Sequence, residues 1–266
     1  MYAVLGRLSA LLLPLQCISC RLFAETTGLC TACWTRLSPV TAPFCQHCGL
    51  PLAEQLVDGI CASCWATPPE MACIRAALRY DDAACDLILK LKHGDGLQLV
   101  PFISQLMAAR FVELTADNPF VVPVPLHRWR YWRRRFNQSA ELARYLCQHY
   151  ERGVYAPDLL IRHRATKSQG GLSRQARKRN LTGAFIPSPT AAQTLRGYPF
   201  LLVDGVMTTG GHIASGHQLF AAGWRWRDSC ADHRPFHMKV ATTPFLPLNT
   251  QHCENRQPAK RPNGQS

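Results

Sequence analysis

Four pairs of cysteines, each with two residues between its members, occupy the first quarter of the chain: Cys17/Cys20, Cys30/Cys33, Cys45/Cys48 and Cys61/Cys64. A CxxC turn places two thiolates on one side of a tight loop, and two such turns complete the tetrahedral shell of a structural zinc ion. Nine residues separate the first two pairs and twelve separate the last two, which is enough for a hairpin or loop. The spacing therefore predicts a double zinc ribbon with two zinc ions over residues 17–67, called the zinc module below.

Other uses of these cysteines fit less well. Redox CxxC motifs usually occur singly beside a βαβ pattern, and iron–sulfur clusters use tighter and less even spacing. The sequence leaves open whether the pairs combine in order or interleave. The five remaining cysteines lack ligand spacing, which favours packing for those in predicted elements. The module could anchor the N-terminus, bind nucleic acid or dock a protein, but its only cations, Arg21 and Arg36, make nucleic acid the less obvious choice.

A second candidate site is the loop that follows the apolar segment 199–203. It begins with Asp204 and contains two threonines and two glycines: Thr208, Thr209, Gly210 and Gly211. In an open α/β sheet, ligands bind beyond the carboxyl ends of the strands. Hydroxyl groups, exposed backbone amides and a helix N-terminus favour a phosphate there, and Asp204 could accept hydrogen bonds from sugar hydroxyls.

Two stretches carry much of the formal net charge of +13. Residues 127–135 read HRWRYWRRR, and no acidic residue occurs from 118 to 140; residues 162–180 hold seven Lys or Arg, and no acidic residue occurs from 159 to 203. Arginines interleaved with aromatic residues are typical of a groove for single-stranded nucleic acid. The candidates for this surface are Arg128, Arg130, Arg133, Arg134, Asn137 and Gln138. The alternative is a solvated loop anchored in the core by Trp129 and Trp132.

The elements that must position these residues alternate between strand and helix. Strands are predicted at 74–80, 120–126 and 199–204, and helices at 82–92, 97–114, 137–150 and 213–222. This alternation indicates an α/β domain with a mainly parallel sheet over residues 74–223. Residues 224–266 have little periodicity and are predicted to be a disordered tail.

The N-terminal segment, residues 1–16, is expected to be a short lead into the zinc module. Its apolar run, 8–15, is shorter than the ~20 residues that a bilayer span needs, and no cleavage site of the A-x-A kind follows it. We expect no membrane span elsewhere and a cytoplasmic protein with reduced thiols.

Three segments together resemble a known family. LLVDGVMTTGG at 201–211 resembles the phosphoribosyl-diphosphate loop of type I phosphoribosyltransferases. PVPL at 123–126 with RRFNQ at 134–138 resembles the PVPL…RGFNQ of the ComF family, which includes the GntX-type proteins. Thr166, Gln169 and Leu172, followed by Arg179-Asn180 and Ala184-Phe185, resemble that family's TxxQxxL…RN…AF segment. The double zinc ribbon is also similar to the N-terminal module of this family.

The resemblance implies a phosphoribosyltransferase-like fold and a role in DNA uptake and utilisation (natural competence), with single-stranded DNA, phosphoribosyl diphosphate and other DNA-uptake proteins as expected partners. Type I phosphoribosyltransferases also close a basic lid over the diphosphate, which here would use Arg174, Arg177, Lys178 and Arg179. Whether the chain catalyses Mg²⁺-dependent phosphoribosyl transfer, only binds these ligands, or is a degenerate copy stays open.

Four departures from the family pattern bear on that choice. Gly205 stands in place of the second acid of the loop, so one contact to the ribose is missing. His212 stands where Ser or Thr usually helps to hold a 5′-phosphate. Arg135 replaces the glycine of RGFNQ, which would be strained if that position uses a positive φ. The family's final apolar strand is not recognisable after Gly223, which a frameshift or a lineage-specific extension would explain.

Overall fold

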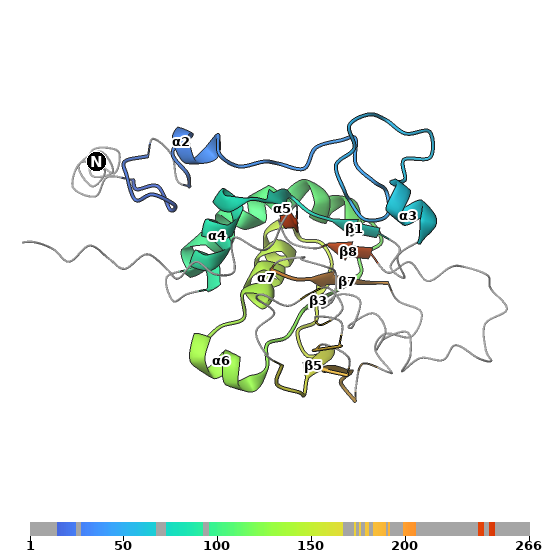
Figure 1. Cartoon of the computed structure of the whole chain (residues 1–266). Coiled ribbons are helices and arrows are strands. Elements are labelled where there is room, and N and C mark those ends of the chain that lie inside the picture. The colour runs from blue at the N-terminus through green and yellow to red at the C-terminus, as the bar shows by residue number, and fades with distance from the viewer. Residues whose placement is uncertain are drawn as a thin grey trace, which may run out of the picture.

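A five-stranded, all-parallel sheet forms the centre of the molecule (Figure 1). The computed structural model describes residues 15–24, 28–67, 73–92, 96–166, 173, 176, 179–180, 183–189, 191, 199–205, 239–241 and 245–247. The strands, in spatial order, are β1 (Cys73–Arg75), β8 (Lys239–Ala241), β7 (Phe200–Val203), β3 (Phe120–Pro123) and β4 (Val154–Tyr155). This architecture confirms the predicted α/β class.

Helices cover one face of this sheet, and their predicted positions are confirmed. They are α4 (Asp82–Lys92), the 3₁₀ turn η1 (Gly96–Leu99), α5 (Val100–Leu114) and α7 (Gln138–Tyr150). Pro101 lies in the first turn of α5, where no intrahelical donor is lost. Asn137 caps α7, because its side-chain oxygen accepts a hydrogen bond from the Ser139 N–H.

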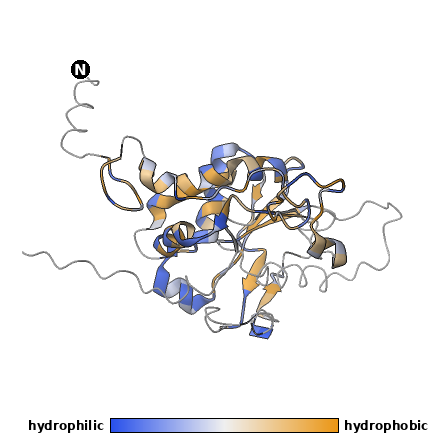
Figure 2. Cartoon of the chain, turned by 45° about the horizontal axis from the view of Figure 1, so that its top comes forward, coloured by the Kyte–Doolittle hydropathy of each residue, from blue (hydrophilic) through white to orange (hydrophobic). Residues whose placement is uncertain are grey.

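Side chains of the buried strands contribute to two separate apolar cores, one on each face of the sheet. Along β7, Leu201 and Val203 pack with the helices, whereas Phe200 and Leu202 pack on the opposite side with Phe185. Successive strand side chains point to opposite faces, so an uninterrupted apolar strand requires a cover on both. Figure 2 shows that the strands are predominantly hydrophobic.

One helical stretch, Gly96–Leu114, is long and apolar enough to cross a membrane by length and composition alone. Ile103, Met107, Phe111 and Leu114 on this stretch are buried in the core that also contains α7 residues. These buried side chains indicate that the stretch is a core element of the α/β domain.

The single strand expected at 74–80 is two short strands. β1 joins the main sheet, while β2 (Leu78–Tyr80) pairs in parallel with β9 (Phe245–Pro247). Between them the Ala77 carbonyl accepts a hydrogen bond from the Val40 N–H of the zinc module. The chain therefore leaves the main sheet where it meets the module.

Two segments of the tail that was expected to be disordered form strands. β8 lies between β1 and β7 in the main sheet, and β9 pairs with β2. Position 239–241 thus supplies a central strand, although its sequence does not resemble the family's final apolar strand. The rest of 224–266, and the helix expected at 213–222, lie outside the described residues.

The end of the molecule opposite the zinc module is formed by α6 (Arg128–Arg134) and an antiparallel pair, β5 (Leu160–Arg162) and β6 (Phe185–Pro187) (Figure 1). The two helices of the zinc module, α2 (Thr31–Trp34) and α3 (Ala62–Ala66), lie at the other end of that view. The candidate metal centres and the basic helix are therefore spatially distinct.

Candidate metal centres and nucleic-acid interface

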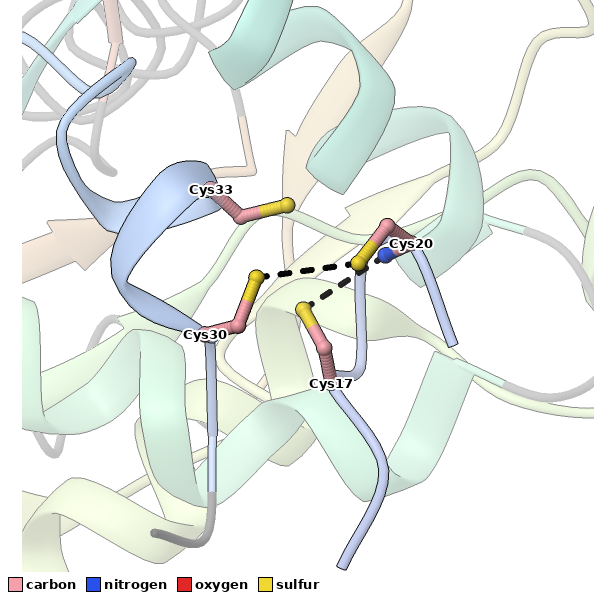
Figure 3. Close-up of side chains that lie close together, drawn as sticks. All are labelled: Cys17, Cys20, Cys30 and Cys33. Atoms are coloured by element: carbon pink, nitrogen blue, oxygen red, sulfur yellow. Dashed lines mark hydrogen bonds between the residues drawn. The ribbon is translucent and has the colours of Figure 1, made fainter. Parts of the chain in front are cut away.

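The first four cysteines converge on one point. The sulfur atoms of Cys17, Cys20, Cys30 and Cys33 all lie within 4.8 Å of one another. Figure 3 shows their side chains pointing toward a common centre, with Cys33 carried by α2. The Cys20 and Cys30 sulfurs are 3.7 Å apart. This arrangement has the ligand number and chemistry of a structural zinc site.

The second four cysteines form a matching cluster. Cys45, Cys48, Cys61 and Cys64 also place their sulfurs within 4.8 Å of one another, and the Cys61 N–H donates to the Cys45 sulfur over 3.3 Å. The pairs therefore combine in sequential order, which the sequence had left open. Both groups of four thiols fit zinc, and the prediction of two such centres is supported.

The thiols of each cluster differ in acidity. At Cys17 burial opposes ionisation, but the backbone N–H groups of Cys20, Cys30 and Ser19 outweigh it and lower the pKa to about 6. Burial, with the neighbouring cysteine side chains, raises the pKa of Cys33 to about 12. In the second cluster the pKa of Cys45 is lowered to about 7 and burial raises that of Cys64 to about 11. Metal binding must therefore displace protons from some of the sulfurs.

The zinc module is fastened to the α/β domain at both ends. Near the first centre, the Lys90 ammonium donates to the Ser19 carbonyl, and Trp34 packs edge-on against Phe102 with 6.1 Å between ring centroids. Near the second, the buried Arg75 donates to the Gln46 carbonyl at 2.8 Å. These contacts indicate that the module is an integral part of the fold.

Arg75 also links that contact to the sheet and to α5. Its Nε donates to Glu113 at 3.0 Å, and its guanidinium lies 5.1 Å from the centre of the Phe44 ring, which Arg110 also covers at 4.4 Å. The Ile74 N–H donates to the His47 carbonyl, next to a cysteine ligand. Disruption of the second centre is thus expected to disturb β1 directly.

Asp204 occupies the predicted position at the carboxyl end of β7. It is buried, and its Oδ1 accepts from the Gly205 N–H at 2.6 Å and lies 3.5 Å from the Ser139 hydroxyl. Ser139 belongs to the first turn of α7, so the carboxylate faces the positive end of a helix dipole. Thr208, Thr209, Gly210 and Gly211 lie outside the described residues, so their prediction is untested.

The aromatic residues of α6 face solvent. Trp129, Tyr131 and Trp132 are 66 %, 51 % and 83 % exposed, which excludes the alternative that the two tryptophans anchor the loop in the core. Arg128 lies over the Trp129 ring at 5.7 Å. In Figure 2 this helix is among the most hydrophilic elements. Large exposed rings flanked by cations are what stacking on unpaired bases requires.

Four of the six residues predicted for the nucleic-acid surface lie on α6. Arg128 and Arg133 are exposed, whereas Arg130 and Arg134 are partly buried, and burial lowers the pKa of both. Asn137 and Gln138 are buried, so the exposed surface of α6 does not include them. Asn137 instead caps α7 and donates to the Val124 carbonyl at 3.0 Å, because the chain turns there from α6 into α7.

Arg135 ends α6 in a left-handed conformation, with φ 64°. The condition under which an arginine here would be strained is therefore met. A side chain there costs roughly 1 kcal/mol relative to glycine.

We expect Arg135→Gly to raise the free energy of unfolding by about 1 kcal/mol, because glycine adopts this conformation without steric cost. Chemical denaturation of the purified variant measures the change. Arg135→Ala is the matched control, since it removes the charge and retains the strain, and it should not stabilise the protein. Equal stability of the glycine and alanine variants would contradict this account.

Of the basic lid candidates, Arg179 is described and exposed, while Arg174, Arg177 and Lys178 lie outside the described residues. Sequence reasoning missed Arg162, which is buried on β5 and shares the hydrogen-bond partner Thr166 with Arg130 of α6. The sequence places this cation at the end of the apolar segment LIR. A single arginine at a strand end is not by itself a distinctive feature.

The comparisons with known proteins agree with this organisation. The family description "Double zinc ribbon domain" matches residues 8–65. DNA utilization protein YhgH of Escherichia coli is 30% identical over 220 residues, covering 79% of this chain and 92% of that protein. Competence protein F of Haemophilus influenzae is 30% identical over 208 residues, covering 73% and 86%. Competence protein ComFC of Bacillus subtilis is 26% identical over 189 residues, covering 68% and 73%.

No solved structure matches the chain. The similarity to the relatives nevertheless extends well beyond the zinc module into the α/β domain, and it covers most of their length. The chain therefore belongs to the ComF family of DNA-utilisation and competence proteins.

Proposed function

We propose that this protein binds single-stranded DNA during DNA utilisation, with α6 as the contact surface. The observation that carries the proposal is the exposure of Trp129 and Trp132 on a helix with four arginines. Exposed rings stack on bases of any sequence, and arginines contact the phosphate backbone. The names of the relatives, which refer to DNA utilisation and competence, support a ligand of this class and partners among DNA-handling proteins.

The electrostatics of α6 favour a polyanion. Among the described residues, Arg128, Arg130, Arg133 and Arg134 have no carboxylate within 4.0 Å, whereas Arg144 on α7 pairs with Glu141 at 2.6 Å. Neighbouring arginines lower the pKa of Arg134 further after burial. A DNA backbone would relieve this repulsion and release counterions.

Fluorescence anisotropy with a labelled single-stranded oligonucleotide, titrated at several salt concentrations, tests the proposal. Binding should be strongest at low salt and should weaken steeply as salt rises. Absence of binding at low salt would exclude it.

A second candidate is recognition of phosphoribosyl diphosphate at the carboxyl end of β7. Asp204 favours it, because its carboxylate is buried at the start of the loop that resembles a phosphoribosyl-diphosphate loop. In such a reaction Mg²⁺ and nearby cations would neutralise the departing diphosphate. No residue of the sequence stands out as a general base, so this candidate is stated as binding without transfer.

The missing second acid gives this candidate a direct test. A Cβ at Gly205 would meet the Gln138 side chain at 3.3 Å, a contact that a flexible side chain can relieve. We expect Gly205→Asp to tighten binding of phosphoribosyl diphosphate with Mg²⁺ by about 1 kcal/mol, roughly fivefold, because it restores one hydrogen-bonding group to the ribose. Isothermal titration calorimetry measures the affinity, and Gly205→Ala is the matched control for the added Cβ. Unchanged affinity would instead favour a degenerate site.

A further inference from the structure

A buried arginine of β5 shares a hydrogen-bond partner with α6. Arg162 is 5% exposed, and its Nε has no hydrogen-bond partner. Its guanidinium lies over the Phe185 ring at 5.1 Å and donates to the Thr166 hydroxyl. Arg130 of α6 donates to the carbonyl of the same Thr166 at 2.7 Å. Two guanidinium groups from different elements therefore meet at one residue.

Within the described part of the chain, Asp204 is the one acidic residue that contributes to the electrostatics of Arg162. Asp204 is the only acidic residue in the sequence from 159 to 227. Burial, Arg130 and Arg164 lower the pKa of Arg162 to about 10, and Asp204 only partly opposes this. Since a buried charge is costly unless it is paired, the arrangement favours an anionic ligand.

We propose that Arg162 and Arg130 bind a terminal phosphate group, the dianionic phosphomonoester at the end of a DNA strand whose bases stack on α6. This inference rests on the proposed single-stranded DNA binding and names the part of the DNA that is recognised. A phosphomonoester neutralises more of the clustered charge than a backbone phosphodiester does. The arginine fork also suits a phosphate oxygen pair.

The burial of Arg162 explains why the recognised phosphate would lie at the end of a DNA strand. Arg128 and Arg133 are exposed and can contact a continuous backbone, whereas the deeply buried Arg162 is better suited to a phosphate with no nucleotide beyond it. Arg130 lies on the same helix as Trp129 and Trp132, so a strand stacked on the exposed rings could direct its end toward Thr166. The same phosphate chemistry also occurs in small ligands such as ribose 5-phosphate, which the experiment must distinguish.

The test compares otherwise identical oligonucleotides with a 5′-phosphate, a 3′-phosphate or hydroxyl groups at both ends, by anisotropy on the full-length protein. We expect one phosphorylated end to bind about tenfold tighter than the hydroxyl form. Arg162→Lys keeps the charge but loses the fork, so it should abolish the preference and leave hydroxyl-ended binding unchanged. Arg144→Gln, on an exposed face of α7, is the matched control and should retain the preference.

Failure of this inference and failure of DNA binding give different results. If all three oligonucleotides bind equally to the wild type, strand-end recognition is overturned while DNA binding stands. If none binds, both are overturned for DNA. If ribose 5-phosphate competes as strongly as the phosphorylated oligonucleotide, recognition of a strand end is overturned. The ligand would then be a small phosphate compound. Should Arg162→Lys fail to fold, judged by thermal unfolding, Arg130→Gln takes its place, and a preference that survives it overturns the proposal.

Discussion

Replacing Cys45 with serine is expected to reduce the bound zinc from two ions to one and to unfold the second half of the zinc module. The reason is that each cluster supplies four sulfurs to one ion, and three sulfurs with a hydroxyl bind zinc far more weakly. Structural zinc contributes on the order of 10 kcal/mol to the folding of small zinc-finger peptides, so the loss should exceed that of an ordinary core substitution. Metal content by mass spectrometry, beside thermal unfolding, measures both effects.

The effect should reach the sheet, because β1 is bonded to the segment between two of the ligands. Ile74 and Arg75 donate to the His47 and Gln46 carbonyls, so hydrogen exchange of β1 should accelerate in the variant. Cys73→Ser, which removes a thiol outside both clusters, is the control and should retain two zinc ions. Full zinc content in Cys45→Ser would contradict the assignment.

Lowering the pH should weaken zinc binding, as the Cys45→Ser substitution does. In the metal-free protein, burial holds the pKa of Cys33 at about 12 and that of Cys64 at about 11, so these sulfurs bind protons at neutral pH. Protons and zinc compete for them, and zinc affinity therefore falls as the pH falls.

Combined replacement of Trp129 and Trp132 by alanine is expected to weaken single-stranded DNA binding by at least about tenfold, since each stacked base contributes ~1–3 kcal/mol. The folded state should be little affected, because both rings are largely exposed. Anisotropy at constant salt measures the affinity, and the salt dependence should persist because the arginines remain.

Trp65→Ala provides the matched control for this pair. Trp65 is also 68% exposed but lies on α3 of the zinc module, at the opposite end of the molecule from α6 (Figure 1). Its removal should leave DNA affinity unchanged. Equal loss of affinity in the two variants would place the DNA on the zinc module, and no loss in the α6 variant would exclude stacking there.

The features that could be predicted from the sequence are those that depend on local spacing. Paired cysteines must lie close together whatever surrounds them, and Pro101 or Asn137 mark helix starts through their own backbone chemistry. The glycine that Arg135 replaces in the family pattern pointed to strain only if the position has a positive φ, and the structure supplies that value.

The features that could not be predicted depend on residues distant in the sequence. Gln138 reads as a polar surface residue, yet the chain turn after α6 buries it beside Gly205. Arg162 reads as one cation among many, and only the meeting of β5 with α6 at Thr166 singles it out. Residues 239–241 carry no strong strand signal, and their place is set by the two strands that flank them.

The central position of β8 in the sheet has a consequence for biosynthesis. β8 leaves the ribosome after every other strand of the five-stranded sheet, although it lies in the interior between β1 and β7. Until it arrives, a nascent chain carries two unpaired strand edges, which are exposed to aggregation and to premature pairing with each other. The zinc module, in contrast, is synthesised first and can take up its metal early. Metal loading and sheet closure are thus separated by nearly the whole time of translation.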